Sequence, residues 1–408
     1  MKFFYRLLFF PVFILAFTGC GKDEDDDDII VINNDDEETT YVEPYHSLDM
    51  KTDDGKVTQL QKHKVGKGVP IVIMGDGFVD KDIKEGKFRE ATNKALEAIF
   101  SKHPLKSLRD YFDVYEVTAV SYHASSAFWG IMDPSTFKTA FSVGVAQEYP
   151  NGVFVGSLQP SKDKKKIAEY AKKAIDVNRI NDATIVMLVN DMFTGGVATD
   201  LTYSYSTEYR EFPTGCGVSY VTLDDIMRPH DDAQYAQNFL HEFGHAFAKL
   251  ADEYVLEEKK WDDFESGKEN LIMYQNSGYS RNVSLESDVT KTYWADFAAD
   301  SRYDFEKLGC YEGAGCQEKG VYRPTENSLM RYTSATSCFN VASRVMIYKR
   351  CMNIAYGDSW KFNYEDFVKF DLEKAKAEHE DIKKQYPDYS KSKRFCAPPR
   401  FVKMKASR

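Results

Sequence analysis

The pattern His-Glu-x-x-His, which begins at His241, constrains the fold of this chain more than any other feature. Histidines four residues apart lie one turn from each other on a helix, so the side chains of His241 and His245 can converge on one ion. Apolar residues recur at helical spacing on the other side of this segment: Phe239, Phe243, Phe247 and Leu250. The segment is therefore predicted to be a buried helix whose polar edge faces a cleft.

The same pattern predicts a catalytic zinc centre. Imidazole nitrogens are good Zn²⁺ ligands, and Glu242 is placed to take a proton from a metal-bound water. Such a centre needs a third protein ligand, for which Asp252 and Glu253 are the local candidates. In a straight helix Asp252 would lie about 16 Å beyond His241. We therefore expect the helix to end between residues 248 and 250 and the chain to fold back, unless the third ligand lies elsewhere.

The order of apolar stretches predicts an α/β fold. Three segments read as strands: 69–74, 112–120 and 184–189. Two helical segments separate them, from Asp80 to about Phe100 and from Ile167 to Ile175, and the metal-binding helix follows the third strand. The chain then turns loop-rich until about Phe362, and a charged helix at 365–385 closes this part of the chain.

A segment between the third strand and the metal-binding helix could bind an extended substrate. It contains the pair Gly195-Gly196 and the tyrosines at 203, 205 and 209. An edge strand of this kind can pair with a peptide through its backbone. The alternative is a surface loop next to an aromatic strand.

The N-terminus carries an export signal at residues 1–20. Lys2 and Arg6 precede an apolar run at 7–17, and Thr-Gly-Cys20 closes it. This arrangement resembles a bacterial lipoprotein signal, with Cys20 as the lipidated residue, although Phe17 stands where leucine is usual. An ordinary secretory signal and a single membrane helix are the alternatives.

Residues 21–40 are predicted to form an acidic, flexible tether. Of the 64 acidic residues in the chain, ten lie before residue 39, so the formal charge of −11 is mainly a property of this region. Lys22 followed by acidic residues resembles a signal for display on the outer face of the outer membrane; a solvated spacer is the alternative. We expect membrane contact only through the lipid, and no nucleic-acid partner, because the chain has no basic patch.

Cysteine usage is consistent with export. Six cysteines follow Cys20, and none forms a Cys-x-x-Cys pair, which argues against a zinc finger: Cys216, Cys310, Cys316, Cys338, Cys351 and Cys396. An oxidising compartment would permit up to three disulfides. We expect Cys310 and Cys316 to pair first, because the loop between them is short; buried free thiols are the alternative.

A second motif lies 85 residues beyond His245. The segment Ser328-Leu-Met-Arg-Tyr332 resembles the Met-turn of the metzincin clan of zinc peptidases. In that clan the methionine, here Met330, forms an apolar floor under the metal, and a tyrosine two residues later can swing toward it. The clan usually has a glycine at the position of Ala248 and its third ligand at the position of Ala251, so this chain departs from the pattern at both.

The block from His241 to Tyr254 resembles the signature H-E-x-G-H-x-x-x-x-L-x-D-E-Y of the IgA-peptidase family, the igalysins, a branch of the metzincins. The similarity is expected to run from Gly-Asp-Gly-Phe at 75–78 through Met330. The resemblance implies a Zn²⁺ endopeptidase with a metzincin-like, two-lobed catalytic domain, containing a mixed sheet, an active-site helix and an irregular lower lobe. The upper lobe would span 41–254 and the lower lobe 255–408.

Site residues follow from the resemblance position by position. His241 and His245 are the expected ligands, and Glu242 is the general base. Asp252 is the expected third ligand, with Glu253 as the alternative, either as ligand or as a residue that holds the turn. Tyr332 is expected to stabilise the oxyanion or to act as a further ligand; the alternative is a core tyrosine.

The expected partner is a protein or peptide substrate, with immunoglobulin as one candidate. Two other functions compete with an endopeptidase. One is a non-enzymatic surface lipoprotein that binds protein or glycan on a peptidase-like fold. The other is a zinc amidase that acts on cell-wall material. The complete set His241, Glu242 and His245 argues against a decayed site.

Overall fold

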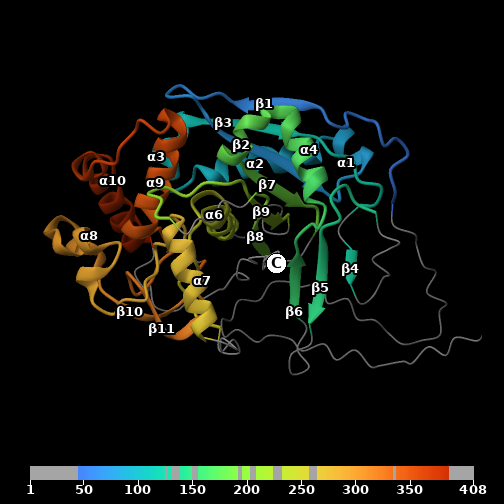
Figure 1. Cartoon of the computed structure of the whole chain (residues 1–408). Coiled ribbons are helices and arrows are strands. Elements are labelled where there is room, and N and C mark those ends of the chain that lie inside the picture. Colours follow the sequence, from blue (N-terminus) through green and yellow to red (C-terminus); the bar gives the residue numbers. More distant parts are fainter. Residues whose placement is uncertain are drawn as a thin grey trace, which may run out of the picture. The chain divides into compact units, whose positions relative to one another are not determined.

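A computed structural model describes residues 45–124, 127–129, 138–148, 155–191, 195–202, 208–223, 232–256, 264–333 and 337–385 (Figure 1). Several predictions fall outside these residues: the export signal with Cys20, the tether at 21–40, Tyr203, Tyr205 and Cys396. Within the described residues, no helix combines the length and the apolar character that spanning a membrane requires.

A six-stranded mixed sheet lies at the centre of the fold, with the strand order β1-β3-β2-β7-β9-β8. The four inner strands run parallel, and the edge strands β1 and β8 are antiparallel to their neighbours. The predicted α/β fold class is thereby confirmed. The strands are β1 (Val57–Gln61), β2 (Val69–Asp76), β3 (Phe112–Val117), β7 (Thr184–Val189), β8 (Gly196–Asp200) and β9 (Gly217–Thr222).

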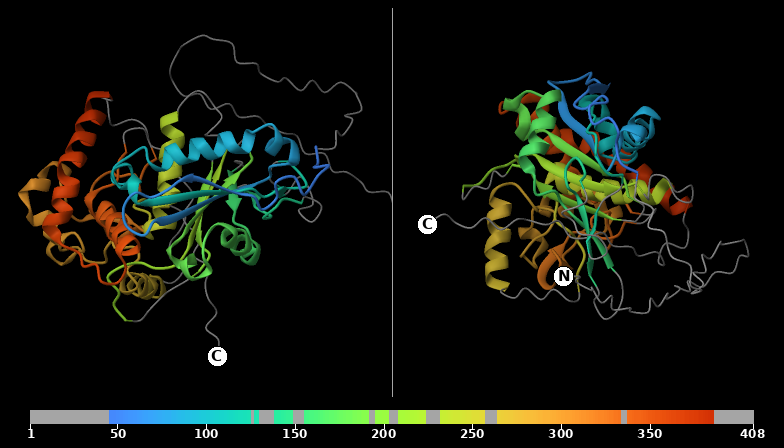
Figure 2. Two further views of the ribbon diagram at one scale, coloured as in Figure 1. Left: turned by 90° about the horizontal axis from the view of Figure 1, so that it is seen from above. Right: turned by 90° about the vertical axis from the view of Figure 1, so that its right-hand side faces the viewer.

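Successive side chains along a strand point to opposite faces of the sheet, and each face contributes to its own apolar cluster. In β2, Ile71 and Ile73 belong to one cluster, whereas Val72 and Met74 belong to the other. Among the described residues, six α-helices contribute to the first cluster: α2 (Lys87–Ile99), α3 (Leu105–Leu108), α6 (Asp232–Ala248), α8 (Ala295–Ala299), α9 (Val341–Tyr356) and α10 (Tyr364–Gln385). Helix α4 (Lys164–Ala174) covers the second. Figure 2 shows α2 and α4 on opposite sides of the sheet.

Most predicted elements of the α/β part are present. The predicted strands at 69–74 and 184–189 are β2 and β7, while β3 ends three residues before its predicted end. The predicted long helix at 80–100 is two helices, α1 (Asp80–Lys84) and α2, because Gly86 lies between them with φ 84°. The predicted closing helix is α10, which starts one residue earlier than expected.

The region after α6 is less loop-rich than predicted. It contains α7 (Phe264–Asn276), α8 (Ala295–Ala299), the hairpin β10 (Tyr311–Ala314) and β11 (Gln317–Arg323), and α9. Helix α9 is buried almost all round, including Arg344 and Arg350. Its sequence therefore lacks the alternation between apolar and polar faces by which a surface helix is identified.

The remaining elements are small. A second sheet has three strands, β4 (Ala127–Trp129), β5 (Gly144–Glu148) and β6 (Val155–Gln159). The described residues also form the 3₁₀ turns η1 (Arg109–Tyr111), η3 (Val177–Asp182), η4 (Val289–Lys291) and η5 (Ser301–Glu306).

The expected Cys310–Cys316 disulfide is not present, and the five cysteines that the structure describes form no disulfide with one another. The hairpin explains the difference. Tyr311 at the start of β10 pairs with Arg323 at the end of β11, whereas Cys316 lies in the turn. At about 3.3 Å per residue, the length of β10 separates the two cysteines by about 13 Å, well beyond the reach of a disulfide.

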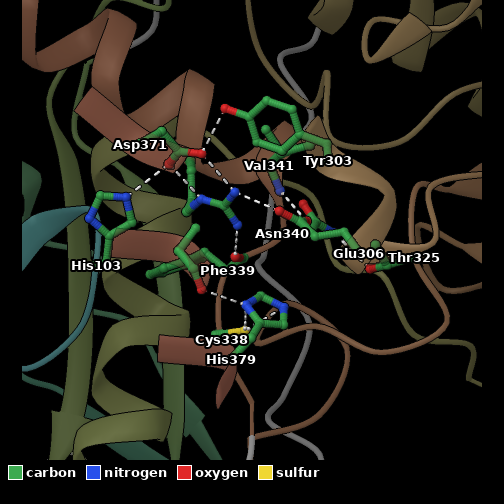
Figure 3. A network of polar contacts seen from close by, with 12 residues as sticks. His103, Tyr303, Glu306, Thr325, Cys338, Phe339, Asn340, Val341, Asp371 and His379 are labelled. Atoms are coloured by element: carbon green, nitrogen blue, oxygen red, sulfur yellow. Dashed lines mark hydrogen bonds and ion pairs between the residues drawn. The ribbon is translucent and has the colours of Figure 1, made fainter. Parts of the chain in front are cut away.

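A buried polar network fixes α9 and α10 to the rest of the fold (Figure 3). The Arg344 guanidinium donates to both oxygens of Asp371 at 2.7 and 2.8 Å and to Glu306 at 2.6 Å. His103 lies 2.8 Å from Asp371, and Tyr303 donates to it at 3.1 Å. Burial alone would raise the pKa of Asp371, but Arg344 and His103 hold that pKa well below its usual range.

Candidate metal centre

Helix α6 is buried against the sheet by one aromatic face. The rings of Phe239 and Phe243, and of Phe243 and Phe247, stack along it with centroids 6.4 and 5.5 Å apart, and Phe247 also contacts Phe112 of β3. The predicted apolar face is therefore present. A Cβ atom at Gly217 of β9 would lie 2.2 Å from the backbone oxygen of Ala246, so the glycine allows the helix to lie directly on the strand.

Helix α6 ends at Ala248, and the chain reverses there as predicted. Lys249 adopts a left-handed conformation with φ 57°, and its N–H donates to the His245 carbonyl at 3.1 Å, which is a left-handed helix C-cap. In this chain the left-handed residue is thus one position later than the glycine of the metzincin pattern. The acidic side chain that returns to the helix, Asp252, is also one position later than usual, so the two departures compensate each other.

Three side chains converge after this reversal. The Nε2 atoms of His241 and His245 are 3.0 Å apart, and Oδ1 of Asp252 lies 3.1 Å from the first and 3.2 Å from the second. Zinc ligands at about 2.0–2.2 Å in a tetrahedron would be roughly 3.4 Å apart. Among the described residues, this is the one group of three that could hold a metal ion.

Backbone carbonyls fix the orientation of both imidazoles. Nδ1 of His241 lies 3.0 Å from the Leu329 carbonyl, and Nδ1 of His245 lies 2.7 Å from the Leu250 carbonyl. Because a carbonyl only accepts, each Nδ1 must carry the proton and donate it. Each Nε2 then directs a lone pair toward the other ligand atoms, which is the arrangement of histidines bound to a metal.

Asp252 completes this set of acceptors. It is buried, and its Oδ1 has no hydrogen-bond donor among the described residues. Two lone pairs and one carboxylate oxygen therefore face one another in a buried place, which fits a divalent cation such as zinc.

Glu242 lies beside this group and is completely buried. Neither of its carboxylate oxygens has a hydrogen-bond partner among the described residues. Burial raises its pKa to about 8. A Cβ atom at Gly196 of the edge strand β8 would lie 2.6 Å from Cγ of Glu242, so the absence of a side chain there makes room for the carboxylate.

The alternative ligand Glu253 has a different position. Its Oε1 accepts hydrogen bonds from Asn282 and Asn340, both at 3.0 Å, and its Oε2 accepts from Ser328 at 2.6 Å. The Glu253 N–H donates to the Met330 carbonyl at 2.8 Å. The carboxylate thus connects the end of the ligand turn to the Met-turn segment and to the N-cap of α9, which agrees with a role in holding the turn.

The Met-turn segment packs against helix α6. Leu329 supplies the carbonyl that orients His241, and Met330 is completely buried. A Cβ atom at Gly244 would lie 3.2 Å from the Met330 sulfur, so the helix and the methionine are in close contact. The side chain of Tyr332 is mostly buried and packs against the Arg331 guanidinium, 4.7 Å from the ring centroid. Its predicted catalytic role stays a prediction.

Four residues around the metal centre were not singled out from the sequence. The ring of Tyr254 stacks on that of His241 with centroids 6.2 Å apart. Asn282 exchanges two hydrogen bonds with the backbone of Ala251, at 2.8 and 2.9 Å. Lys249 forms a buried ion pair with Asp200. Tyr254 belongs to the signature itself, but no local pattern indicates Asn282 or Asp200, because each contacts the turn across a long stretch of chain.

Comparison with known proteins gives one family. The model of the family described as IgA Peptidase M64 matches residues 59–303, more than half of the chain. The match includes all of α6 and the ligand turn but ends before the Met-turn, so the expected extent through Met330 exceeds it. No curated protein matches the chain.

Proposed function

Because this chain belongs to the IgA peptidase M64 family and is therefore a metallopeptidase, we propose that it is an exported zinc endopeptidase with Glu242 as its general base. The observation that carries the proposal is the convergence of His241, His245 and Asp252, whose ligand atoms lie 3.0–3.2 Å apart. Two nitrogens and one oxygen form a usual zinc donor set and leave a coordination position for water.

When bound, zinc would polarise the scissile carbonyl and lower the pKa of its water toward 7. The role of Glu242 follows from its own surroundings. Its carboxylate is buried, has no hydrogen-bond partner in the part of the chain that the structure describes, and has a pKa raised to about 8. Such a group is suited to take a proton and then to release it to the leaving amine. Tyr332 is proposed to donate a hydrogen bond to the oxyanion.

The edge strand β8 is the proposed binding site for an extended substrate. Within the described ranges it has one neighbour in its sheet, β9, and its first residue, Gly196, contacts Glu242. A peptide that paired with β8 would therefore pass beside the proposed general base. This favours an unfolded or extended segment of a protein as substrate over a small amide. It also supports the proposed endopeptidase rather than the cell-wall amidase.

The proposal is tested by comparing residues 39–408 with the Glu242→Ala variant. Both proteins are incubated with a complex protein mixture that includes immunoglobulins, and new N-termini are identified by mass spectrometry. We expect new termini only with the wild type, a loss of rate of at least about 10³-fold in the variant, and equal zinc content in both. Activity that persists in the variant would exclude Glu242 as the base.

The location of the protein is a second part of the proposal. We infer that Cys20 is lipidated and that the acidic tether displays the peptidase outside the outer membrane. The expected result is that the Cys20→Ser chain leaves the membrane fraction and loses incorporation of labelled palmitate, while its peptidase activity is unchanged. A variant that stays in the membrane fraction would contradict the lipid anchor, and protease treatment of intact cells would test surface display.

A further inference from the structure

A buried ion pair connects the turn that carries Asp252 to the edge strand β8. Lys249 follows the last residue of α6, and its ammonium contacts Oδ1 of Asp200, the last residue of β8. Both side chains are nearly inaccessible to water, with 2 % and 4 % of their surface exposed. The aliphatic part of Lys249 is enclosed with it, and the Tyr279 ring lies 5.8 Å from the ammonium.

The backbone at Lys249 determines the position of two of the three proposed ligands. Its left-handed conformation starts the reversal that returns Asp252 to the helix. The next residue, Leu250, supplies the carbonyl that accepts the hydrogen bond of His245 Nδ1 at 2.7 Å. A rotation of the chain at Lys249 would therefore move the Asp252 carboxylate and also release the imidazole of His245.

A lysine is an unexpected residue for this conformation. Glycine adopts a positive φ without strain, whereas a side chain with a Cβ is disfavoured there. The surroundings compensate, because the Lys249 carbonyl accepts a hydrogen bond from Ser280 N–H at 2.8 Å and the ammonium is paired with Asp200. A buried charge must keep its partner, so the ion pair holds the turn to a single arrangement relative to β8.

We propose that Lys249 is a positioning residue, which holds His245 and Asp252 in place for the metal through its ion pair with Asp200. The inference rests on the proposed function, since it assigns this residue a role in retaining zinc. It also connects the metal ligands to the proposed substrate strand, because β8 contacts Glu242 at Gly196 and the ligand turn at Asp200.

The test removes both charges together, so that no buried ion is left unpaired. The double variant Lys249→Met with Asp200→Asn keeps similar side-chain volumes. The control is Arg89→Met with Glu116→Gln, which removes a partly exposed ion pair of 2.7 Å between α2 and β3, elements that supply no residue of the metal centre. For each protein, zinc affinity is measured by competition with a chromogenic chelator, together with the melting temperature of the metal-free form, kcat and KM.

We expect the zinc dissociation constant of the double variant to rise at least about tenfold and its kcat to fall, with KM changed less than about twofold. The control should keep the zinc affinity of the wild type even where its melting temperature falls. Equal zinc affinity in the double variant would overturn the proposal. If the double variant does not fold, the same comparison is made with Lys249→Gln and Asp200→Asn together, which also removes both charges but keeps polar groups at both positions. Unchanged zinc affinity there would also overturn the proposal. A wild-type protein that binds no zinc would instead refute the proposed function itself.

Discussion

At the scale of single residues, the candidate metal centre depends on glycines that make room for neighbouring side chains as well as on the side chains themselves. Gly196 and Glu242 show this, since a Cβ on the glycine would lie 2.6 Å from Cγ and 2.9 Å from Oε1 of the glutamate. Neither atom can accept such a contact without moving. The glutamate is buried, so its side chain has few alternative positions.

Gly196→Ala is therefore expected to lower kcat at least about tenfold, because the carboxylate is displaced from the water that it must deprotonate. Zinc content should stay at the wild-type level, since the three atoms nearest to the new methyl group all belong to Glu242 and not to a proposed ligand. Steady-state kinetics and metal analysis check this. Gly309→Ala is the matched control, because a Cβ there meets nothing closer than 3.4 Å. Wild-type kcat in Gly196→Ala would contradict the close contact between β8 and the base.

The sequence predicts part of this centre, and the limits have a physical cause. Helical spacing predicts His241 and His245 as ligands. The distance of about 16 Å that a straight helix would put between His241 and Asp252 predicts the reversal that brings Asp252 back. Asn282 and Asp200 could not be predicted, because their contacts with the turn depend on the tertiary fold. The choice between Asp252 and Glu253 needed the structure, which places the two neighbouring carboxylates in opposite surroundings: one faces two imidazoles, the other three hydrogen-bond donors.

At the scale of elements, α10 is held by groups whose charge depends on pH. Nδ1 of His379 donates to the Ala375 carbonyl at 2.9 Å, and its Nε2 lies 3.6 Å from the Cys338 sulfur (Figure 3). Burial lowers the pKa of His379, but Cys338 and Glu306 outweigh burial and raise it to about 9. The protonated imidazole therefore stabilises the packing of α10 on the Met-turn side of the fold.

The direction of the pH effect follows from this shift. A histidine whose pKa rises from 6.5 to about 9 on folding contributes its full stability below pH 6.5 and loses it as the pH rises through 9. His379→Gln is expected to lower the free energy of unfolding by about 2 kcal/mol at pH 6, and by little at pH 10. Urea denaturation at both pH values measures this. Lys384→Gln changes an exposed residue of the same helix and should have the free energy of unfolding of the wild type at both pH values. If His379→Gln lost the same free energy of unfolding at both pH values, the raised pKa of His379 would be contradicted.

Helices were predicted from the sequence where one face of the helix is apolar and the other is polar. Helices α4 and α10 have amphipathic sequences and were predicted within a few residues. Helix α9 was missed, since its polar residues are buried as well, with Arg344 and Arg350 paired inside the protein. Strand β9 was also missed. It is buried along its whole length, and its sequence, Gly-Val-Ser-Tyr-Val-Thr, contains small and polar residues.

At the scale of the whole molecule, one apolar cluster joins the sheet to the helices of the C-terminal part. Residues of β2 and β3 share it with α6, with Met330 and with α9 and α10. Helix α6 therefore lies between the sheet and the segment that carries the Met-turn. The proposed ligands come from this central helix and from the turn that follows it, so metal binding and the stability of the fold should be coupled.

Removal of the metal is expected to destabilise the molecule measurably. Without a cation, Oδ1 of Asp252 and two imidazole lone pairs face one another in a buried site, and the ion binds the folded chain but not the unfolded one. At a free zinc concentration of about a thousandfold over the dissociation constant, binding contributes about 4 kcal/mol, which corresponds to a fall of roughly 5–10 °C in melting temperature on chelation. Differential scanning calorimetry with chelator, and again after zinc is restored, measures the change. The His245→Ala chain lacks one ligand and should melt at nearly the same temperature with and without chelator. A wild-type protein that melts unchanged after its metal has been removed would mean that the three side chains do not need an ion to remain together.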